Sequence, residues 1–484
     1  MKKFLLLPLL MTLCLLFNAK AQEKKPNIIF ILADDLGYGD VGFNGQRLIN
    51  TPNLDRLAKE GIRFNQFYAG TAVCAPSRSA LMSGQHTGHT FIRGNLGVEP
   101  EGQYPIPDSV ETIAETLKKA GYQTGAFGKW GLGPVGSEGD PNKQGFDRFY
   151  GYNCQSLAHR YYPTHLWDNS EKVVLTENGD LEYHKQYAPD LIQEQALGFI
   201  EEHKDRPFFL FLPYILPHAE LLVPDDSIFQ YYKGKFEEKP FKGFDYGKGA
   251  KSGGYASQQY PHATFAAMVA RLDLYVGQIE EKLRSLGLDE NTLIIFTSDN
   301  GPHKEGGADP TFFQSSGGLR GIKRDLYEGG IRVPFVAKWP KAIRVGQQSE
   351  FIGAFWDIFP TFAELGGAAT AASTDGISFV NTLKGQGTQK QHEYLYWEFH
   401  EQGSKQAVRY GKWKGVRLNV KADGGAPIEL YDLSATEPRR ITSLSNILKL
   451  LKKLPDSCKK HTQIIPFSRG NKRIDISPLP LFRP

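Results

Sequence analysis

The pattern of hydrophobic and polar positions predicts a buried sheet covered by helices. Continuous apolar runs, typical of strands covered on both faces, span residues 27–33 (NIIFILA), 207–214 and 292–298 (TLIIFTS). Between them, apolar residues at helical spacing predict helices within residues 110–117, 191–199 and 263–286. Gly287 is a suitable stop for the last helix. This alternation predicts an α/β domain with a mainly parallel sheet.

A different pattern follows the polar link at residues 385–392 (GQGTQKQH). Alternating strand-like segments at 394–399, 407–418 and 428–433 predict a smaller antiparallel sheet. A chain of 484 residues is longer than one hydrophobic core usually supports. We therefore expect a large domain over residues 22–385 and a smaller α+β subdomain over residues 386–484. Residues 235–259, rich in Gly, Lys and aromatics, are expected to form a surface loop.

The N-terminus has the features of an export signal. Lys2 and Lys3 precede the apolar run 4–17, and the small residues around Lys20 offer a cleavage site after Ala21. The run is short for crossing a bilayer, so no stable membrane anchor is expected. We predict a signal peptide over residues 1–21 and export to the periplasm or the extracellular medium.

The formal net charge of +4 hides an uneven distribution. The predicted signal peptide carries three lysines, and residues 436–484 hold 11 Lys and Arg against 3 Asp and Glu, so residues 22–435 carry about −7. An acidic body does not favour nucleic acid as a partner. The atypical basic tail from about residue 436 has two interpretations. One is a basic amphipathic helix at 447–454; the other, which the abrupt change of composition favours, is a reading-frame error near residue 435.

Two acidic pairs follow the first and last buried runs directly. Asp34-Asp35 follows residues 27–33, and Asp299-Asn300 follows residues 292–298. Because open α/β sheets place ligands at the carboxyl ends of their strands, these pairs should lie close together. Three carboxylates and one amide oxygen suit Ca²⁺ or Mg²⁺. Alone, either pair is more typical of an ordinary turn.

Cys74 is the most informative of the four cysteines. Only Cys74, Cys154 and Cys458 follow the predicted signal peptide, which is no disulfide framework. Pro76 and the helix-forming run after it place Cys74 at a helix N-terminus, where free N–H groups favour an anion. Arg78 adds a fixed positive charge. A lone cysteine is more often a small buried apolar residue, but this setting favours a nucleophile.

The motifs around these residues resemble those of one known family. The C-x-P-S-R signature with its following Ser-Gly occupies residues 74–84 of this chain, which resembles the formylglycine-dependent (type I) sulfatases of the alkaline-phosphatase superfamily. The resemblance extends from residue 26 to about 434 and includes DDLGYGD (34–40), TPNLDRLAKEG (51–61), GKWGLG (128–133), SDNG (298–301) and GIKRDLYEGGIRVP (321–334). It implies an alkaline-phosphatase-like fold and hydrolysis of sulfate esters.

The resemblance also implies roles for individual residues. A formylglycine-generating or anaerobic maturation enzyme would oxidise Cys74 to formylglycine (3-oxoalanine), whose hydrate attacks sulfur. The implied ligands of Ca²⁺, or less suitably Mg²⁺, are residue 74 and the side chains Asp34, Asp35, Asp299 and Asn300. Arg78 would hold the hydrate, and Lys129, His218 and Lys323 would contact the sulfate and its leaving oxygen. An oxygen-rich diol suits Ca²⁺ better than a thiol does.

The chain departs from the family pattern at Gly131. The family usually has a histidine there, placed to take a proton from the diol, and glycine cannot act as a base. We predict that His159 takes over this role or contacts the substrate. Alternatively, water accepts the proton and the enzyme is slower.

Three further segments bear on the substrate. His303 and Lys304 follow the metal motif and should face the substrate. With residues 159–163 (HRYYP) they resemble bacterial carbohydrate sulfatases, so a sulfated carbohydrate is the expected substrate. Two alternatives stay open: a phosphonate or phosphate-ester hydrolase of the same superfamily, and a non-catalytic protein that binds sulfated glycans.

Overall fold

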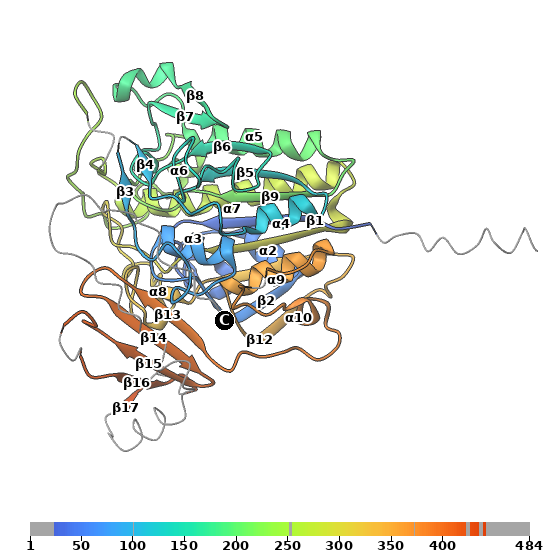
Figure 1. Cartoon of the computed structure of the whole chain (residues 1–484). Coiled ribbons are helices and arrows are strands. Elements are labelled where there is room, and N and C mark those ends of the chain that lie inside the picture. The colour runs from blue at the N-terminus through green and yellow to red at the C-terminus, as the bar shows by residue number, and fades with distance from the viewer. Residues whose placement is uncertain are drawn as a thin grey trace, which may run out of the picture.

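A computed structural model describes residues 24–99, 101–250, 254–371, 373–422, 426–434 and 439–441. Its main feature is a ten-stranded sheet in the order β12-β2-β11-β10-β1-β9-β5-β6-β7-β8 (Figure 1). The central pairs from β10 to β6 are parallel, and β11, β7 and β8 add antiparallel pairs. The strands are β1 Asn27–Ala33, β2 Ile62–Tyr68, β5 Gln123–Lys129, β6 Arg148–Tyr152, β7 His165–Asp168, β8 Glu171–Val174, β9 Phe208–Pro213, β10 Thr292–Ser298, β11 Phe335–Lys338 and β12 Gln347–Ala354.

Helices cover both faces of this sheet. One buried cluster joins alternate residues of the strands to α2, α5 and α7, and a second joins the other residues to α3, α4, α9 and α10. Because both faces are covered, β1 can be apolar at every position after Asn27. The described helices are α2 Pro52–Glu60, α3 Cys74–Ser83, α4 Ile113–Lys119, α5 Ala188–Glu202, α6 Ser227–Tyr232, α7 Pro261–Ser285, α8 Glu328–Ile331, α9 Ile358–Gly366 and α10 Val380–Lys384.

Short elements connect these layers. The hairpin of β3 Gly97–Val98 and β4 Gly102–Gln103 lies apart from both large sheets. The described 3-10 helices are η2 Gly42–Asn44, η3 Leu157–His159, η4 Thr176–Leu181, η5 Asp289–Asn291 and η6 Phe355–Asp357. Residues 233–260 contain no strand or helix among those described, apart from one bridge between Phe241 and Gln258. This agrees with the loop expected over residues 235–259.

The second sheet is antiparallel, as predicted, and has the order β13-β14-β15-β16-β17. Its strands are β13 Leu395–Phe399, β14 Lys405–Tyr410, β15 Trp413–Arg417, β16 Glu429–Asp432 and β17 Arg439–Ile441. The prediction of one strand over residues 407–418 is wrong. Gly411, with φ +55°, turns the chain there, and the segment forms the hairpin of β14 and β15.

The small sheet packs against the segment that precedes α3. A third buried cluster joins Trp397 and Phe399 of β13 to Ala72 and Val73. The indole N–H of Trp397 donates to the carbonyl of Ala69 over 3.0 Å, and the Thr71 hydroxyl donates to the carbonyl of Glu398 over 2.9 Å. The C-terminal region thus fixes the backbone that carries Cys74.

Some predictions fall on residues that the structure does not describe. The signal peptide at residues 1–21, Cys458 and the basic tail beyond residue 441 lie outside the described residues. Within the described ranges, no helix has the length and apolar character needed to cross a membrane.

Candidate active site at the carboxyl edge of the large sheet

Two adjacent parallel strands bring the predicted metal ligands together. β1 and β10 pair in register from Asn27–Thr292 to Ala33–Ser298, so the acidic pairs that follow them lie side by side. The backbone N–H of Asp35 donates to Oδ1 of Asp299 over 3.1 Å, and Nδ2 of Asn300 donates to Oδ1 of Asp35 over 2.7 Å. Asp34, Asp35, Asp299 and Asn300 are all fully buried.

Cys74 begins α3 and faces these acids, as predicted. Its Sγ lies 3.2 Å from Oδ1 of Asp34. Arg78, one turn later, donates from its terminal nitrogen to Oδ2 of Asp299 over 2.9 Å and lies 3.3 Å from Oδ2 of Asp34. The hydroxyl of Ser77 donates to the Asp299 carbonyl over 2.6 Å and fastens the first turn of α3 to the end of β10.

Two lysines complete the charge balance of the site. Nζ of Lys129, the last residue of β5, lies 2.6 Å from Oδ2 of Asp34. Nζ of Lys323 lies 2.7 Å from Oδ2 of Asp35 and 3.1 Å from Nε2 of His218. The other ring nitrogen of His218 bonds to the carbonyl of Ala219, so Nε2 is free to accept the Lys323 proton in the neutral ring.

The electrostatics of the site follow from burial and close pairing. Burial raises the pKa of Asp34, but Lys129 and Arg78 outweigh it and lower that pKa to about 2. Burial and then Lys323 hold the pKa of His218 well below its usual range, so this ring is neutral at pH 7. Burial and then Asp34 raise the pKa of the Cys74 thiol well above its usual range. An unmodified Cys74 is therefore a protonated, weak nucleophile.

Histidines form one wall beside Lys323. The rings of His159 and His218 stack with centroids 5.3 Å apart, and those of His218 and His303 lie 5.8 Å apart. Nδ1 of His303 accepts from the N–H of Glu305 over 3.1 Å, and its Nε2 lies 3.0 Å from the carbonyl of Pro217. Both nitrogens of His303 are therefore engaged with the backbone. Lys304 is exposed.

Several residues of the site were not predicted from the sequence. Glu305 lies 3.1 Å from Nζ of Lys323 and also pairs with Arg324. Tyr255, from the surface loop, lies against His159 with ring centroids 5.3 Å apart. For Glu305 a signal existed, because it directly follows His303 and Lys304; nothing in the sequence predicts that the loop folds back to place Tyr255 here.

The donor set fits a hard divalent cation. Asp34, Asp35 and Asp299 crowd three carboxylates together, and burial with the nearby Asp34 raises the pKa of Asp299 to about 7. Oδ1 of Asn300 is buried and has no hydrogen-bond partner in the described part of the chain. A buried acceptor without a partner is costly, and a cation would satisfy it. Oxygen ligands of this kind are those that Ca²⁺ takes.

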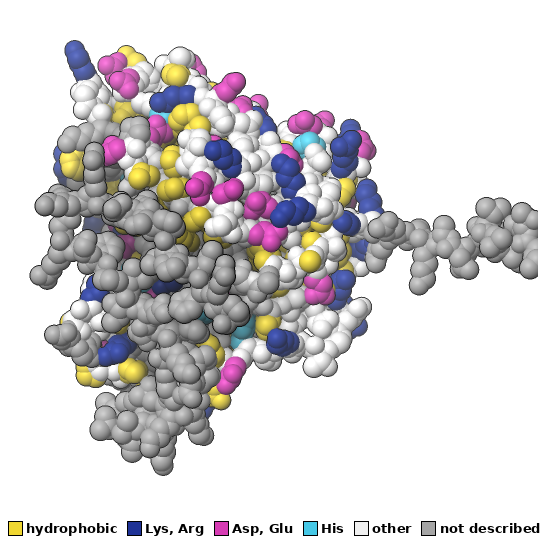
Figure 2. Space-filling model, viewed as in Figure 1, with side chains coloured by type: hydrophobic (Ala, Val, Ile, Leu, Met, Phe, Trp, Pro, Cys, Tyr) yellow, Lys and Arg dark blue, Asp and Glu magenta, His cyan; other side chains and the backbone are white. Residues whose placement is uncertain are grey.

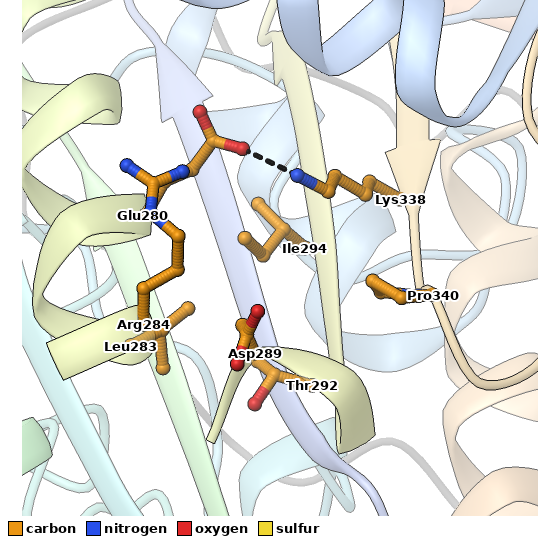
Figure 3. A pocket seen from close by; sticks show the side chains of 8 residues that line it. All are labelled: Glu280, Leu283, Arg284, Asp289, Thr292, Ile294, Lys338 and Pro340. Carbon is orange, nitrogen blue, oxygen red and sulfur yellow. Dashed lines mark hydrogen bonds and ion pairs between the residues drawn. The ribbon is translucent and has the colours of Figure 1, made fainter. Parts of the chain in front are cut away.

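A small pocket lies at the opposite edge of the sheet and is distinct from this site. Thr292, the first residue of β10, and Lys338 line it with Glu280, Leu283 and Arg284 of α7 (Figure 3). The outer surface is mixed in charge: on the face in Figure 2, basic and acidic side chains are interspersed over its described part.

Comparison with known proteins decides the family. A family model described as "Sulfatase" matches residues 26–368. The chain belongs to the sulfatase family. This sulfatase also matches a model described as "N-sulphoglucosamine sulphohydrolase, C-terminal" over residues 322–461. That match continues past residue 435, so it gives no support to a break in the reading frame there. As a family member, this sulfatase is a sulfuric ester hydrolase.

Individual relatives support the same family assignment. Arylsulfatase A of Homo sapiens is 34% identical to this sulfatase over 421 residues, which cover 81% of this chain and 75% of the relative. N-acetylgalactosamine-6-sulfatase of Mus musculus is 31% identical over 400 residues, covering 76% of this chain and 68% of the relative. Among solved structures, Ps i-CgsB in complex with k-i-k-neocarrahexaose has a TM-score of 0.72 at 30% identity, covering 88% of this chain and 90% of that one.

Proposed function

We propose that this protein is an exported, calcium-dependent sulfatase that acts on sulfated carbohydrates with a formylglycine at position 74. One observation carries the proposal: Sγ of Cys74 lies 3.2 Å from a carboxylate of a buried acidic cluster in which Oδ1 of Asn300 has no partner among the described residues. A thiol held protonated beside a carboxylate is poorly placed to attack an anionic ester. The hydrate of an aldehyde would supply neutral oxygen ligands and an oxygen nucleophile instead.

The chain's own residues then have distinct tasks. Asp34, Asp35, Asp299 and Asn300 would hold Ca²⁺, which when bound would polarise the sulfuryl group and bring the residue-74 hydroxyl to its attack position. Lys129, Lys323 and Arg78, already buried at the site, would counter the negative charge that grows on the sulfuryl oxygens.

Lys323 is the proposed proton donor to the leaving oxygen. Its Nζ lies 3.1 Å from Nε2 of a neutral His218, so the two residues share one proton in a hydrogen bond. Burial lowers the pKa of Lys323, but Asp35, Glu305 and the other acidic groups nearby together outweigh burial and raise this pKa well above its usual range, which keeps the proton on the lysine until substrate arrives. His218 would hold Nζ in place by accepting this hydrogen bond, and Lys323 would regain its proton from solvent after release.

The carbohydrate part of the proposal rests on two supports. The wall of His159, His218, His303 and Tyr255 offers aromatic faces against which a sugar ring can stack. Ps i-CgsB, named above, holds an oligosaccharide in its solved complex. A phosphonate or phosphate-ester hydrolase is the alternative activity, since the same charges suit a phosphoryl group.

The first test is the mass of the tryptic peptide that contains residue 74, from protein made with a maturation enzyme. The expected mass is that of an aldehyde or its hydrate; an unmodified thiol, when a control sulfatase is modified in the same cells, would contradict the mechanism. Rates on 4-nitrophenyl sulfate and 4-nitrophenyl phosphate then separate the two activities. Faster phosphate cleavage would overturn the assignment to sulfate esters. Sequencing the N-terminus of secreted protein tests export: we expect it to begin after Ala21.

A further inference from the structure

Gly131 leaves a space beside the active site that the side chain of Gln155 occupies. A Cβ added at Gly131 would lie 2.9 Å from Nε2 of Gln155, which is closer than a carbon and a nitrogen normally approach. Gly131 has φ +77°, in the left-handed region that favours glycine. Its N–H donates to the carbonyl of Asn153 over 3.1 Å, which holds the ends of β5 and β6 together past the last strand residues. The glycine and the glutamine are thus fitted to each other.

The polar atoms in this corner lack partners. Nε2 of Gln155 and both side-chain polar atoms of Asn153 are buried and have no hydrogen-bond partner among the described residues. Asn153 is only 2% exposed. A buried donor or acceptor left without a partner is costly, so three such atoms two residues apart in the chain indicate that something outside the chain completes them. Together they offer donors and an acceptor, which matches a hydroxyl group, itself both donor and acceptor.

The segment that carries these amides forms a wall of the active site. Lys129, two residues before Gly131, bonds to Asp34 and so points into the site. The segment that carries Asn153 and Gln155 continues to His159, whose ring stacks on His218 beside Lys323. Residues 153–159 therefore run from beside Lys129, which pairs with Tyr152, to the histidines beside the proposed proton donor.

We propose that Gln155, supported by Asn153, is a specificity-determining residue that hydrogen-bonds a ring hydroxyl of a sugar next to the sulfate ester. This inference rests on the proposed carbohydrate substrate. A neutral amide cannot accept a proton at neutral pH, so its role is binding and not base catalysis. The amide N–H₂ donates to the hydroxyl oxygen, and Asn153 provides the acceptor for the hydroxyl proton.

The test compares two substrates of the modified, calcium-loaded enzyme. One is whichever of galactose 6-sulfate, N-acetylgalactosamine 6-sulfate and N-acetylglucosamine 6-sulfate the wild type cleaves fastest; the other is 4-nitrophenyl sulfate, whose ring has no hydroxyl. We expect Gln155→Ala to lower kcat/KM on the sugar by about 10- to 100-fold and on the aryl ester by less than about 3-fold. Ser156→Ala, at the exposed neighbouring position, is the matched control and should change neither.

Several outcomes would overturn the inference. An equal loss on both substrates would make Gln155 a general structural residue, and no loss on the sugar would remove it from the binding site. If Gln155→Ala does not fold, Gln155→Met keeps a similar volume, removes the amide donor without adding a charge and should show the same selective loss. A wild type with formylglycine but without activity on any sulfate ester would instead defeat the proposed function itself.

A second measurement uses the fit between the two positions. Gly131→His should lower activity on both substrates because its Cβ meets Gln155, and histidine tolerates a left-handed φ better than most residues do. In the double variant with Gln155→Ala the clash is gone, so activity on the aryl ester should recover while the loss on the sugar persists. Strictly additive effects at the two positions would contradict the close contact.

Discussion

The two edges of the large sheet contain the same kinds of charged residues but differ in how these residues are paired. At the amino edge, Glu280 of α7 accepts from Arg56 over 2.6 Å and from Lys338 over 2.8 Å, so each carboxylate oxygen has its own cation. At the carboxyl edge, three carboxylates share three cations, and Oδ1 of Asn300 has no partner in the described chain. Charge alone does not mark a functional site; crowding of like charges with an unpartnered buried acceptor does.

The sharpest way to separate the two edges is to neutralise one acid at each. Asp299→Asn should lower kcat/KM on 4-nitrophenyl sulfate by at least about 10³-fold, because it removes a proposed metal ligand and a partner of Arg78. Glu280→Gln, the matched control, should keep activity within about 3-fold. Steady-state kinetics of both modified variants would decide. Comparable losses in the two variants would erase the functional distinction between the edges.

Metal removal should act on one edge only. Chelation with EGTA is expected to lower activity by about 100-fold or more and to lower Tm by about 3 °C, since a ligand that binds only the folded state stabilises it. Added Ca²⁺ should restore both better than Mg²⁺ does. The control is Glu280→Gln, whose Tm should respond to Ca²⁺ as the wild type does. Activity that survives chelation, with metal content near zero by mass spectrometry, would refute a metal at the carboxyl edge.

A variant at His159 tests whether the wall of histidines takes part in the reaction. If it accepts the proton in place of the usual histidine at position 131, His159→Ala should preserve the burst of released alcohol but lower steady-state turnover by about 100-fold. His203→Ala, at the end of α5, should leave both unchanged. Rapid-mixing measurements with 4-nitrophenyl sulfate would show the burst. Normal steady-state turnover in the His159 variant would end this hypothesis.

The amino edge should matter for stability instead. Glu280 is 2% exposed, and Glu280→Gln leaves Arg56 without its charged partner and Lys338 with Glu60 as its remaining one. We expect a loss of about 1–2 kcal/mol in the free energy of unfolding, measured by denaturant titration. The exposed pair Lys119–Glu111 is the control, because Glu111→Gln there should cost less than about 0.5 kcal/mol. Equal costs would mean that burial adds nothing to the Glu280 pairs.

The smallest predicted effect is a pH dependence of stability. Burial, then Lys129, lowers the pKa of His159 to about 4 from its usual 6.5. Between pH 6.5 and 4 the unfolded chain therefore binds a proton that the folded protein excludes, so acidification destabilises the fold. For this residue the loss from pH 7.5 to 5.5 should be about 1 kcal/mol. His159→Asn should remove that part of the acid loss; an unchanged pH profile would contradict the low pKa.

Much of the fold could be predicted from the sequence, because the strongest patterns coincide with the most buried elements. The predicted bounds of β1 and β10 agree with the structure, since helices cover both faces and both strands carry a continuous apolar run. The hairpin at Gly411 was missed because a single glycine inside a strand-like run is a weak turn signal.

The candidate site likewise contains residues that could be predicted from the sequence and residues that could not. Residues at strand ends, such as Asp34 and Asp299, could be placed because parallel strands bring their carboxyl ends to one edge. Tyr255 could not, since its position depends on a long loop. That loop is tied down by Glu220, which accepts from the N–H of Ala256 over 3.1 Å and pairs with the fully buried Arg160. Such contacts join residues far apart in the chain, so no local spacing of residues in the sequence predicts them.

The position of β1 in the middle of the sheet limits when the sheet can form during synthesis of the chain. The strand is almost the first described segment of the chain, yet its partners β9 and β10 begin at residues 208 and 292. The central sheet can therefore close only after most of the chain has been synthesised, and closure between such distant segments is slow. Cys74 is 1% exposed in the finished fold. The proposed maturation enzyme would therefore have to reach Cys74 before the sheet closes, and slow closure would lengthen that interval.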